Sequence, residues 1–168
     1  MKTRLPAILA GLFLVATANA DIVESSDSHY VLKHEATSSL TPDALWARFI
    51  VPADWWHPDH TYSGDANNLS LQPNAGGLWL ERWDGGSVIH GSVLYVEDGK
   101  SMRLYAPFGP LQGLGVYTVW TITISAEGTG SKVVFDEISS GPPSADLDEL
   151  AKAVDYVKNE GITRLTAD

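Results

Sequence analysis

The residue types best suited to chemistry gather in one short segment, Trp55 to Asp65, which reads WWHPDHTYSGD. His57 and His60 carry imidazoles, which titrate near neutral pH and ligate metals, and Asp59 and Asp65 add carboxylates. Prolines mark irregular backbone here, so neither helical nor strand periodicity guarantees that these side chains converge. The segment indicates the rim of a site, and these four residues form a candidate metal cluster.

A second candidate is the pair Glu81 and His90 in a predicted hairpin over residues 78–96. Side chains alternate between the faces of a strand, and a two-residue turn fixes which residues face each other. With Gly85-Gly86 as the turn, Glu81 faces His90 at about 5 Å between Cβ atoms. With Asp84-Gly85 as the turn the two still share a face, whereas a three-residue turn separates them.

Such a pair has three interpretations. Glu81 can orient His90 as a general base in an acid/base dyad, or the two can bind the polar head of a ligand. They can also be a satisfied structural pair, since a buried carboxylate needs a partner.

A metal-assisted variant adds His60 to Glu81 and His90, which gives the two-histidine, one-carboxylate set of non-haem iron sites. It requires the rim segment to fold over the hairpin. Apart from this divalent ion, no cofactor is expected. The run Gly109 to Gly115 lacks the Lys and Ser/Thr of a phosphate loop, and is interpreted as an apolar pocket loop or an ordinary strand connection.

The elements that must position these residues follow from local patterns. Residues 29–36 alternate as a first strand, and Thr41 with Pro42 begins a short helix over residues 42–49. A second short helix carrying Trp55 and Trp56 is expected before Pro58. Six further strands follow, separated by Gly-rich turns, over residues 69–72, 78–83, 88–96, 102–108, 116–125 and 132–138.

The last element is an amphipathic helix over residues 146–159, for which Gly161 is the predicted C′ residue. The order of elements predicts an α+β domain. A curved antiparallel sheet of seven strands is expected to bury one face against this long helix, with a pocket between them.

The chain begins with features of a secretory signal peptide. Lys2 and Arg4 precede an apolar run that is too short to span a membrane, and Ala18-Asn19-Ala20 resembles a cleavage site after Ala20. We therefore expect a signal peptide over residues 1–20, a flexible leader over 21–28 and a single domain over 29–168. This organisation predicts a periplasmic or secreted protein.

Composition restricts the partners. The 168-residue chain has a formal net charge of −10 and no cysteine. Nucleic acid and anionic lipid both need clustered Lys or Arg, so neither is an expected partner, and no stable membrane span remains after cleavage. Without cysteine, thiolate catalysis and disulfides are excluded. The sequence does not identify a protein partner.

Six short strings follow one another in a specific order: TPDALW at 41–46, WW at 55–56, HTYSGD at 60–65, GGLW at 76–79, HGSV at 90–93 and GPLQ at 109–112. In these strings and in its order of elements, the chain resembles the START-related, polyketide-cyclase-like SRPBCC superfamily, which has the helix-grip fold. The likeness covers roughly residues 30–160, and an exported bacterial branch is similar in its HTYSGD and GPLQ strings.

The resemblance implies a hydrophobic pocket between the sheet and the C-terminal helix, and it supplies no catalytic residues. The expected function is binding of a small hydrophobic or amphipathic ligand for carriage, sensing or sequestration. The alternative is an enzyme of the cyclase or hydrolase type that uses His90 and Glu81, with or without a metal held by His60. The expected pocket residues are Trp56, Trp79, Trp83, Leu104, Phe108, Trp120, Leu150, Val154 and Val157.

Overall fold

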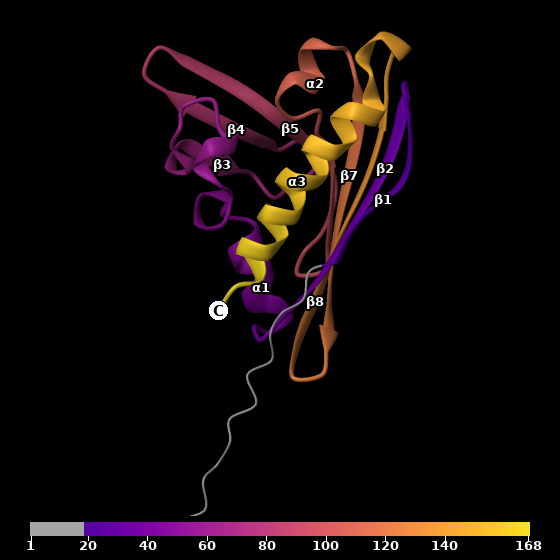
Figure 1. Ribbon diagram of the computed structural model, residues 1–168. Helices are drawn as coiled ribbons and strands as arrows, with labels where there is room; N and C mark the ends of the chain where they lie inside the picture. Colours follow the sequence, from indigo (N-terminus) through magenta and orange to yellow (C-terminus); the bar gives the residue numbers. More distant parts are fainter. Residues whose placement is uncertain (1–18) are drawn as a thin grey trace, which may run out of the picture.

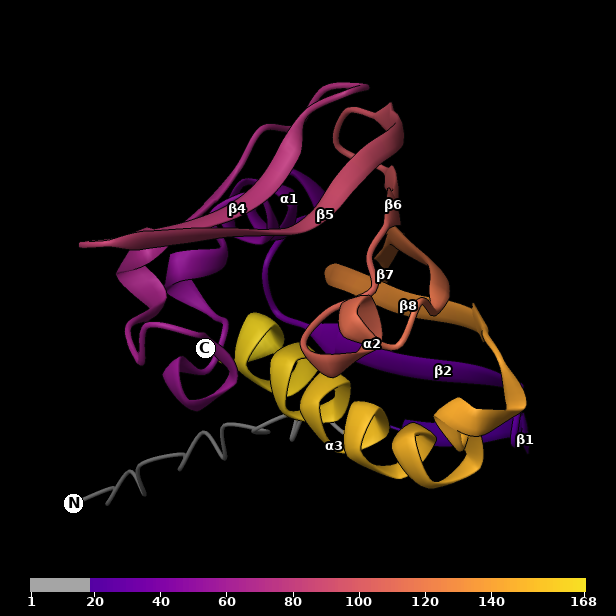
Figure 2. The same ribbon diagram turned by 90° about the horizontal axis from the view of Figure 1, so that it is seen from above.

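The computed structural model describes residues 19–168, so the charged start and apolar run of the predicted signal peptide lie outside the described residues. The described chain is an α+β structure in which one antiparallel sheet curves around a C-terminal helix (Figures 1 and 2). Within residues 19–168, no helix combines the length and hydrophobicity needed to cross a bilayer.

The sheet has eight strands in the order β1-β2-β8-β7-β6-β5-β4-β3. Every neighbouring pair is antiparallel, and the chain reaches β3 from β2 through the α1 region. The strands are β1 (Asn19–Ser26), β2 (His29–Ser38), β3 (Leu69–Leu71), β4 (Leu78–Trp83), β5 (Gly86–Glu97), β6 (Ser101–Tyr105), β7 (Tyr117–Glu127) and β8 (Gly130–Ser140).

The predicted strand number was one too low, because the expected flexible leader forms the edge strand β1. Residues 21–26 pair with β2 across a bulge between Ile22 and Glu24. Their side chains are exposed, so the segment carries no buried apolar alternation that would mark it as a strand. Its backbone pairing, which leaves no sequence signal, defines the strand.

Three α-helices accompany the sheet in the described chain: α1 (Pro42–Phe49), the short α2 (Pro110–Gly113) and α3 (Leu147–Thr166). Thr41 caps α1 as predicted, since its side chain accepts from the backbone N–H of Ala44. The predicted second helix was wrong. The chain there forms the single 3₁₀ turns η1 (Pro52–Asp54), η2 (Pro58–His60) and η3 (Ala66–Asn68), because prolines interrupt it repeatedly.

The helix α3 is longer than predicted and crosses the concave side of the sheet (Figure 2). Gly161 lies inside it and does not end it. A Cβ atom at this position would approach Trp55 Cζ3 to 3.2 Å and Trp56 Cζ3 to 3.5 Å. The glycine therefore admits two indole rings against the helix, and this tertiary packing outweighs its low helix propensity.

The main core lies between α1, the 3₁₀ turns and the sheet, and aromatic rings dominate it. Trp55, Trp79 and Trp120 are all fully buried. Trp55 contacts Trp79 edge to face, with ring centroids 5.8 Å apart, and Trp120 contacts Phe135 in the same way at 4.9 Å. This aromatic core fixes the rim segment and α3 on the sheet.

Candidate functional site

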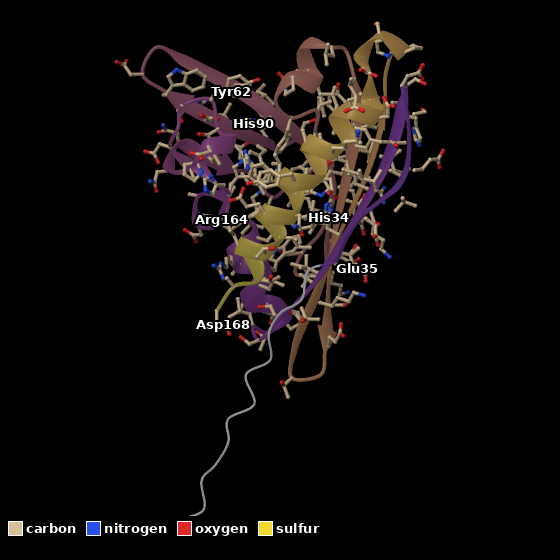
Figure 3. The ribbon with its side chains drawn as sticks, in the orientation of Figure 1. His34, Glu35, Tyr62, His90, Arg164 and Asp168 are labelled. Carbon is tan, nitrogen blue, oxygen red and sulfur yellow. The ribbon has the colours of Figure 1, made fainter. Side chains whose placement is uncertain are left out.

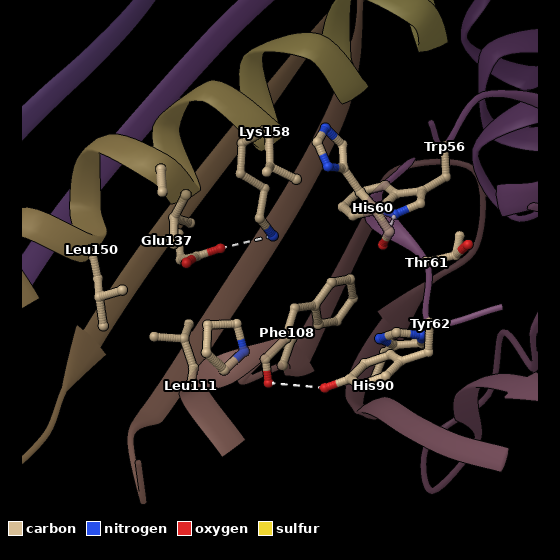
Figure 4. Close-up of a pocket in the computed structure, with 16 residues that line it drawn as sticks. Trp56, His60, Thr61, Tyr62, His90, Phe108, Leu111, Glu137, Leu150 and Lys158 are labelled. Carbon is tan, nitrogen blue, oxygen red and sulfur yellow. Dashed lines mark hydrogen bonds and ion pairs between the residues drawn. The ribbon is translucent and has the colours of Figure 1, made fainter. Parts of the chain in front are cut away.

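A pocket of about 490 Å³ lies between α3, the α2 loop, the rim segment and the sheet (Figure 4). Its walls are mainly apolar. Leu150, Val154 and Val157 line it from α3, and Phe108 and Leu111 line it from the opposite side. These positions are spaced along one face of α3, as the helix periodicity predicts.

The rim of the pocket comes from the segment after Trp56. His60, Thr61 and Tyr62 line the pocket, and the Tyr62 hydroxyl donates to the carbonyl of Gly109 at 3.3 Å. Figure 4 shows this contact closing one side between the rim and the loop that precedes α2. The prediction that residues 55–65 form a rim therefore agrees with the geometry.

The floor of the pocket carries a buried charge pair that joins α3 to β8. Lys158 Nζ lies 2.8 Å from Glu137 Oε2, and both side chains are almost completely buried. The two groups form an ion pair, and no other described residue accepts a hydrogen bond from the Lys158 amine. Both residues line the pocket. The Lys158 donors that do not point at Glu137 are thus available to a ligand's oxygen.

The ammonium of Lys158 sits within aromatic rings. Its Nζ lies 3.2 Å from the centroid of Trp120 and 4.9 Å from that of Phe108. Burial lowers the pKa of Lys158, and the neighbouring Glu137 carboxylate opposes this shift. The ring faces also favour the charged form. A cation is therefore held at the base of an otherwise apolar pocket.

Tyr30 supports the carboxylate of this pair. Its hydroxyl donates to Glu137 Oε1 at 2.7 Å, and burial together with the Glu137 charge raises the Tyr30 pKa far above its ordinary value. The phenol therefore stays protonated and remains a donor. Tyr30 thus holds Glu137 in the orientation that places its other oxygen beside Lys158.

Glu81 and His90 meet as predicted. In the β4–β5 hairpin Trp83 pairs with Gly86, so the turn residues are Asp84-Gly85. A bulge follows, since Trp79 pairs with Gly91 and Leu80 pairs with Ile89, and His90 is the extra residue. The bulge turns the imidazole so that its Nε2 donates to Glu81 Oε2 at 2.8 Å.

Both oxygens of the Glu81 carboxylate accept hydrogen bonds. The backbone N–H groups of Tyr62 and Ser63 donate to its two oxygens at 3.1 and 2.6 Å. Burial raises the Glu81 pKa, but the hydrogen bonds from Ser63, Tyr62 and His90 outweigh it and leave the pKa below its ordinary value. Burial lowers the His90 pKa despite Glu81. Glu81 thus anchors the rim to the hairpin, while only His90 reaches the pocket.

The predicted metal set of His60, Glu81 and His90 was wrong. His60 Nε2 lies 2.8 Å from Glu160 Oε2 on α3, and Glu81 is occupied by the rim backbone. In residues 21–168, the one group of three with convergent ligand atoms is His57, His60 and Glu160.

The two aspartates of the predicted loop cluster have other surroundings. Asp65 Oδ1 accepts from the backbone of Asn67 and caps the turn η3. The Asp59 side chain is 83% exposed, and its Oδ2 lies 3.8 Å from His57 Nδ1. The structure therefore joins the two histidines of that cluster, leaves Asp65 out, and supplies the carboxylate from α3.

The predicted ligand-binding residues divide into two groups. Trp56, Phe108, Leu150, Val154 and Val157 line the pocket. The other four do not: Trp79, Leu104 and Trp120 are packed in the core, and Trp83 stacks on Tyr62 with ring centroids 6.4 Å apart. Side chains alternate between the two faces of a strand, which places Trp79, Leu104 and Trp120 on the inner face of the sheet. The helix α3 and the rim segment cover most of that face, so these residues lie in the core and do not line the pocket.

Sequence reasoning missed Lys158, Glu137 and Glu160. Lys158 and Glu160 lie close to the end of the predicted helix, where a charged residue is ordinarily solvated. Lys158 follows Val154 at the helical i, i+4 spacing. It therefore lies one turn further along the apolar face of the helix. That continuation is the signal that points to a buried cation.

No protein-family model and no curated protein sequence matches this chain. Solved structures match its fold. A protein from Rhodobacter sphaeroides is 18% identical with a TM-score of 0.59, over 88% of this chain and 96% of that one. Protein Ms6760 from Mycobacterium smegmatis is 13% identical with a TM-score of 0.59, over 87% and 94%. Protein CV1439 from Chromobacterium violaceum is 16% identical with a TM-score of 0.56, over 81% and 94%.

These matches cover most of each chain, so those proteins share a similar antiparallel-sheet fold with it. At such identities the likeness shows the fold alone. The function must be argued from the pocket and its side chains.

Proposed function

We propose that this protein binds a small ligand with an apolar body and one polar group that reaches Lys158. The pocket carries the proposal, because its apolar walls end at a buried amine that is paired with Glu137 alone and has further donors to offer. Ligand sites are typically mostly apolar with a few placed polar groups, in volumes of roughly 300 to 1,000 Å³. The pocket, at about 490 Å³, falls in that range.

The polar group of the ligand is an oxygen acceptor, such as a carboxylate, carbonyl or hydroxyl. A buried ammonium offers three donors and no acceptor. Because Glu137 already balances the charge of Lys158, a neutral oxygen fits as well as an anionic one. Carriage, sensing and sequestration are all compatible with such binding.

The helix across a curved antiparallel sheet supports assignment to the helix-grip, SRPBCC-like superfamily, whose pockets take apolar ligands. The sequence of residues 1–20 supports export, with the ligand bound in the periplasm or outside the cell. Cleavage after Ala20 leaves residues 21–26 of β1 available to pair with β2. Amino-terminal sequencing of the protein from fractionated cells tests this, with Asp21 as the expected first residue.

The test of binding is native mass spectrometry of protein purified from its own compartment. Ala153 lines the pocket and is exposed, so Ala153→Trp places an indole at the mouth. Lys152→Trp adds the same ring at the neighbouring exposed position outside the lining. We expect a bound small molecule on the wild type and on Lys152→Trp, and its loss from Ala153→Trp. A wild-type mass equal to the bare chain, for protein with a cooperative unfolding transition, contradicts the proposal.

A second candidate function is catalysis by His90, favoured by its position on the pocket wall with Glu81 fixed behind it. With Nε2 donating to Glu81, the neutral imidazole keeps Nδ1 as a base. If the co-purified ligand is a product, His90→Gln removes turnover by orders of magnitude and leaves binding within a few fold. If the protein only binds, the variant changes affinity modestly and no conversion is seen in the wild type.

A further inference from the structure

We propose that His57, His60 and Glu160 bind a divalent transition-metal ion, zinc above all, at the mouth of the pocket. One ligand atom from each residue lies within 4.8 Å of the other two. Two imidazoles and a carboxylate form a donor set suited to zinc and to iron, and not to magnesium or calcium. This metal site is a proposal separate from ligand binding, because the ion can bind whether or not a molecule occupies the pocket.

The 3₁₀ turn η2 brings the two histidines together. His57 precedes Pro58 and His60 ends the turn, and the backbone N–H of His60 donates to the His57 carbonyl at 3.0 Å. With three residues per turn, side chains at i and i+3 lie one above the other. The ring centroids are accordingly 5.5 Å apart. The convergence that sequence spacing alone could not guarantee results from this turn.

Glu160 supplies the third ligand from a distant part of the chain. Its carboxylate spans the two imidazoles, with Oε2 at 2.8 Å from His60 Nε2 and Oε1 at 3.5 Å from His57 Nε2. Among the described residues it forms no ion pair with Lys or Arg. The carboxylate is therefore free of a fixed cation and faces two potential metal ligands.

The frame that carries the three side chains is rigid. Trp56 Nε1 donates to the His60 carbonyl at 3.1 Å, and Arg164 Nε donates to the Trp55 carbonyl at 2.9 Å. Gly161, next to Glu160, packs directly against both indoles. Rim and helix are thus locked to each other beside the site, which is the support that a preorganised metal site needs.

Binding requires side-chain adjustments and a change of the His57 tautomer. Zn–N bonds of about 2.0–2.1 Å in a tetrahedral site separate ligand atoms by about 3.3 Å, so His60 Nε2 and Glu160 Oε2 must move slightly apart from 2.8 Å. His57 Nδ1 accepts from the backbone N–H of Asp59, so its Nε2 carries the proton that points to Glu160. For Nε2 to bind the ion, that proton moves to Nδ1, the bond from the Asp59 N–H is lost, and the nearby Asp59 carboxylate becomes the acceptor for Nδ1–H.

Three protein ligands leave at least one coordination position open. His60 and its neighbours Thr61 and Tyr62 line the pocket, so the ion lies where the pocket opens. Figure 4 shows the His60 ring beside α3 at this edge.

Calorimetric titration of untagged, chelator-treated protein with zinc chloride tests the site. We expect one zinc per chain, and a loss of affinity of about tenfold or more in each of His57→Ala, His60→Ala and Glu160→Gln. His29→Ala is the matched control, because His29 lies on β2 with Ser140 as its partner. It should bind zinc as the wild type does.

A second measurement separates specific coordination from loose association. Coordination uses the Glu160 carboxylate, so Glu160→Gln must reduce the heat of zinc binding without altering the near-ultraviolet spectrum. Absence of stoichiometric binding by the wild type overturns the proposal. Equal affinities of the wild type and the three variants, or a loss in His29→Ala, also overturn it. The His57 and Glu160 variants test the metal site independently of the pocket, since these two residues lie outside its lining, whereas His60 belongs to it.

Discussion

Lys158 Nζ on α3 lies 2.8 Å from Glu137 Oε2 on β8, at the floor of the pocket. This ion pair therefore joins the helix to the sheet, and neither side chain is more than 3% exposed. A pair so deeply buried has a large desolvation cost, and each charge is tolerated only because of the other. Figure 3 shows the position of α3 between the β4–β5 hairpin and β1–β2, and Figure 4 shows the contact of Lys158 with Glu137.

The first prediction concerns the stability of this pair. Lys158→Met leaves the Glu137 carboxylate buried without a cation and should lower the free energy of unfolding by about 3–5 kcal/mol. Lys158→Met combined with Glu137→Gln removes both charges and keeps an acceptor for Tyr30, so most of that loss should be recovered. Urea unfolding measures both. A single variant as stable as the wild type, or a double variant no better than the single, contradicts the assignment.

The second prediction concerns the glycine in α3. Gly161→Ala improves helix propensity by about 1 kcal/mol, but its methyl group must displace the Trp55 ring, at a typical cost of about 1–3 kcal/mol. We expect net destabilisation, measured by thermal unfolding. Gly113→Ala in α2 is the control, because a Cβ atom there meets nothing within 4 Å. Gly113→Ala should leave the stability unchanged or raise it. A Gly161→Ala variant that is as stable as the wild type, or more stable, is incompatible with close packing of Gly161 against Trp55.

The third prediction concerns pH. Burial lowers the pKa of His34 and of His90, although Asp155 and Glu81 oppose the shift. An unfolded histidine titrates near pH 6.5, so below about that pH the unfolded chain binds more protons than the folded one. The free energy of unfolding should therefore fall between about pH 7.5 and about pH 5.5.

Glu81 gives a separate, more acidic window. Its pKa lies below the ordinary value of 4.5, so the stability that it contributes is present above that value and is lost as the pH falls further. Urea unfolding across both windows checks the signs. Combined His34→Gln and His90→Gln should flatten the first window, and a wild type that is more stable at about pH 5.5 than at about pH 7.5 refutes the histidine account.

Most of the fold was predictable from local patterns. The strands from β2 to β8 follow alternating runs with Gly-rich turns between them, and the Thr41 cap places α1. The edge strand β1 was missed because its pairing is a backbone property, and the end of α3 was misplaced because Gly161 serves tertiary packing.

The candidate site was only partly predictable. The pairing of Glu81 with His90 followed from strand alternation, since two of the three turns considered place them on one face. The partners of Lys158 and His60 did not follow, because Glu137 lies 21 positions from Lys158 and Glu160 lies 100 positions from His60. Such pairings depend on how α3 is seated on the sheet, which no local pattern encodes.

The most direct test of ligand binding is a fluorescence titration with anilinonaphthalene sulfonate, an apolar body with one anionic group. We predict one saturable site per chain, and about tenfold weaker binding in Ala153→Trp and in the charge-free pair Lys158→Met with Glu137→Gln. Lys152→Trp should bind as the wild type does. Equal affinity in Ala153→Trp and Lys152→Trp, with all proteins unfolding cooperatively, would show that this pocket is not the binding site.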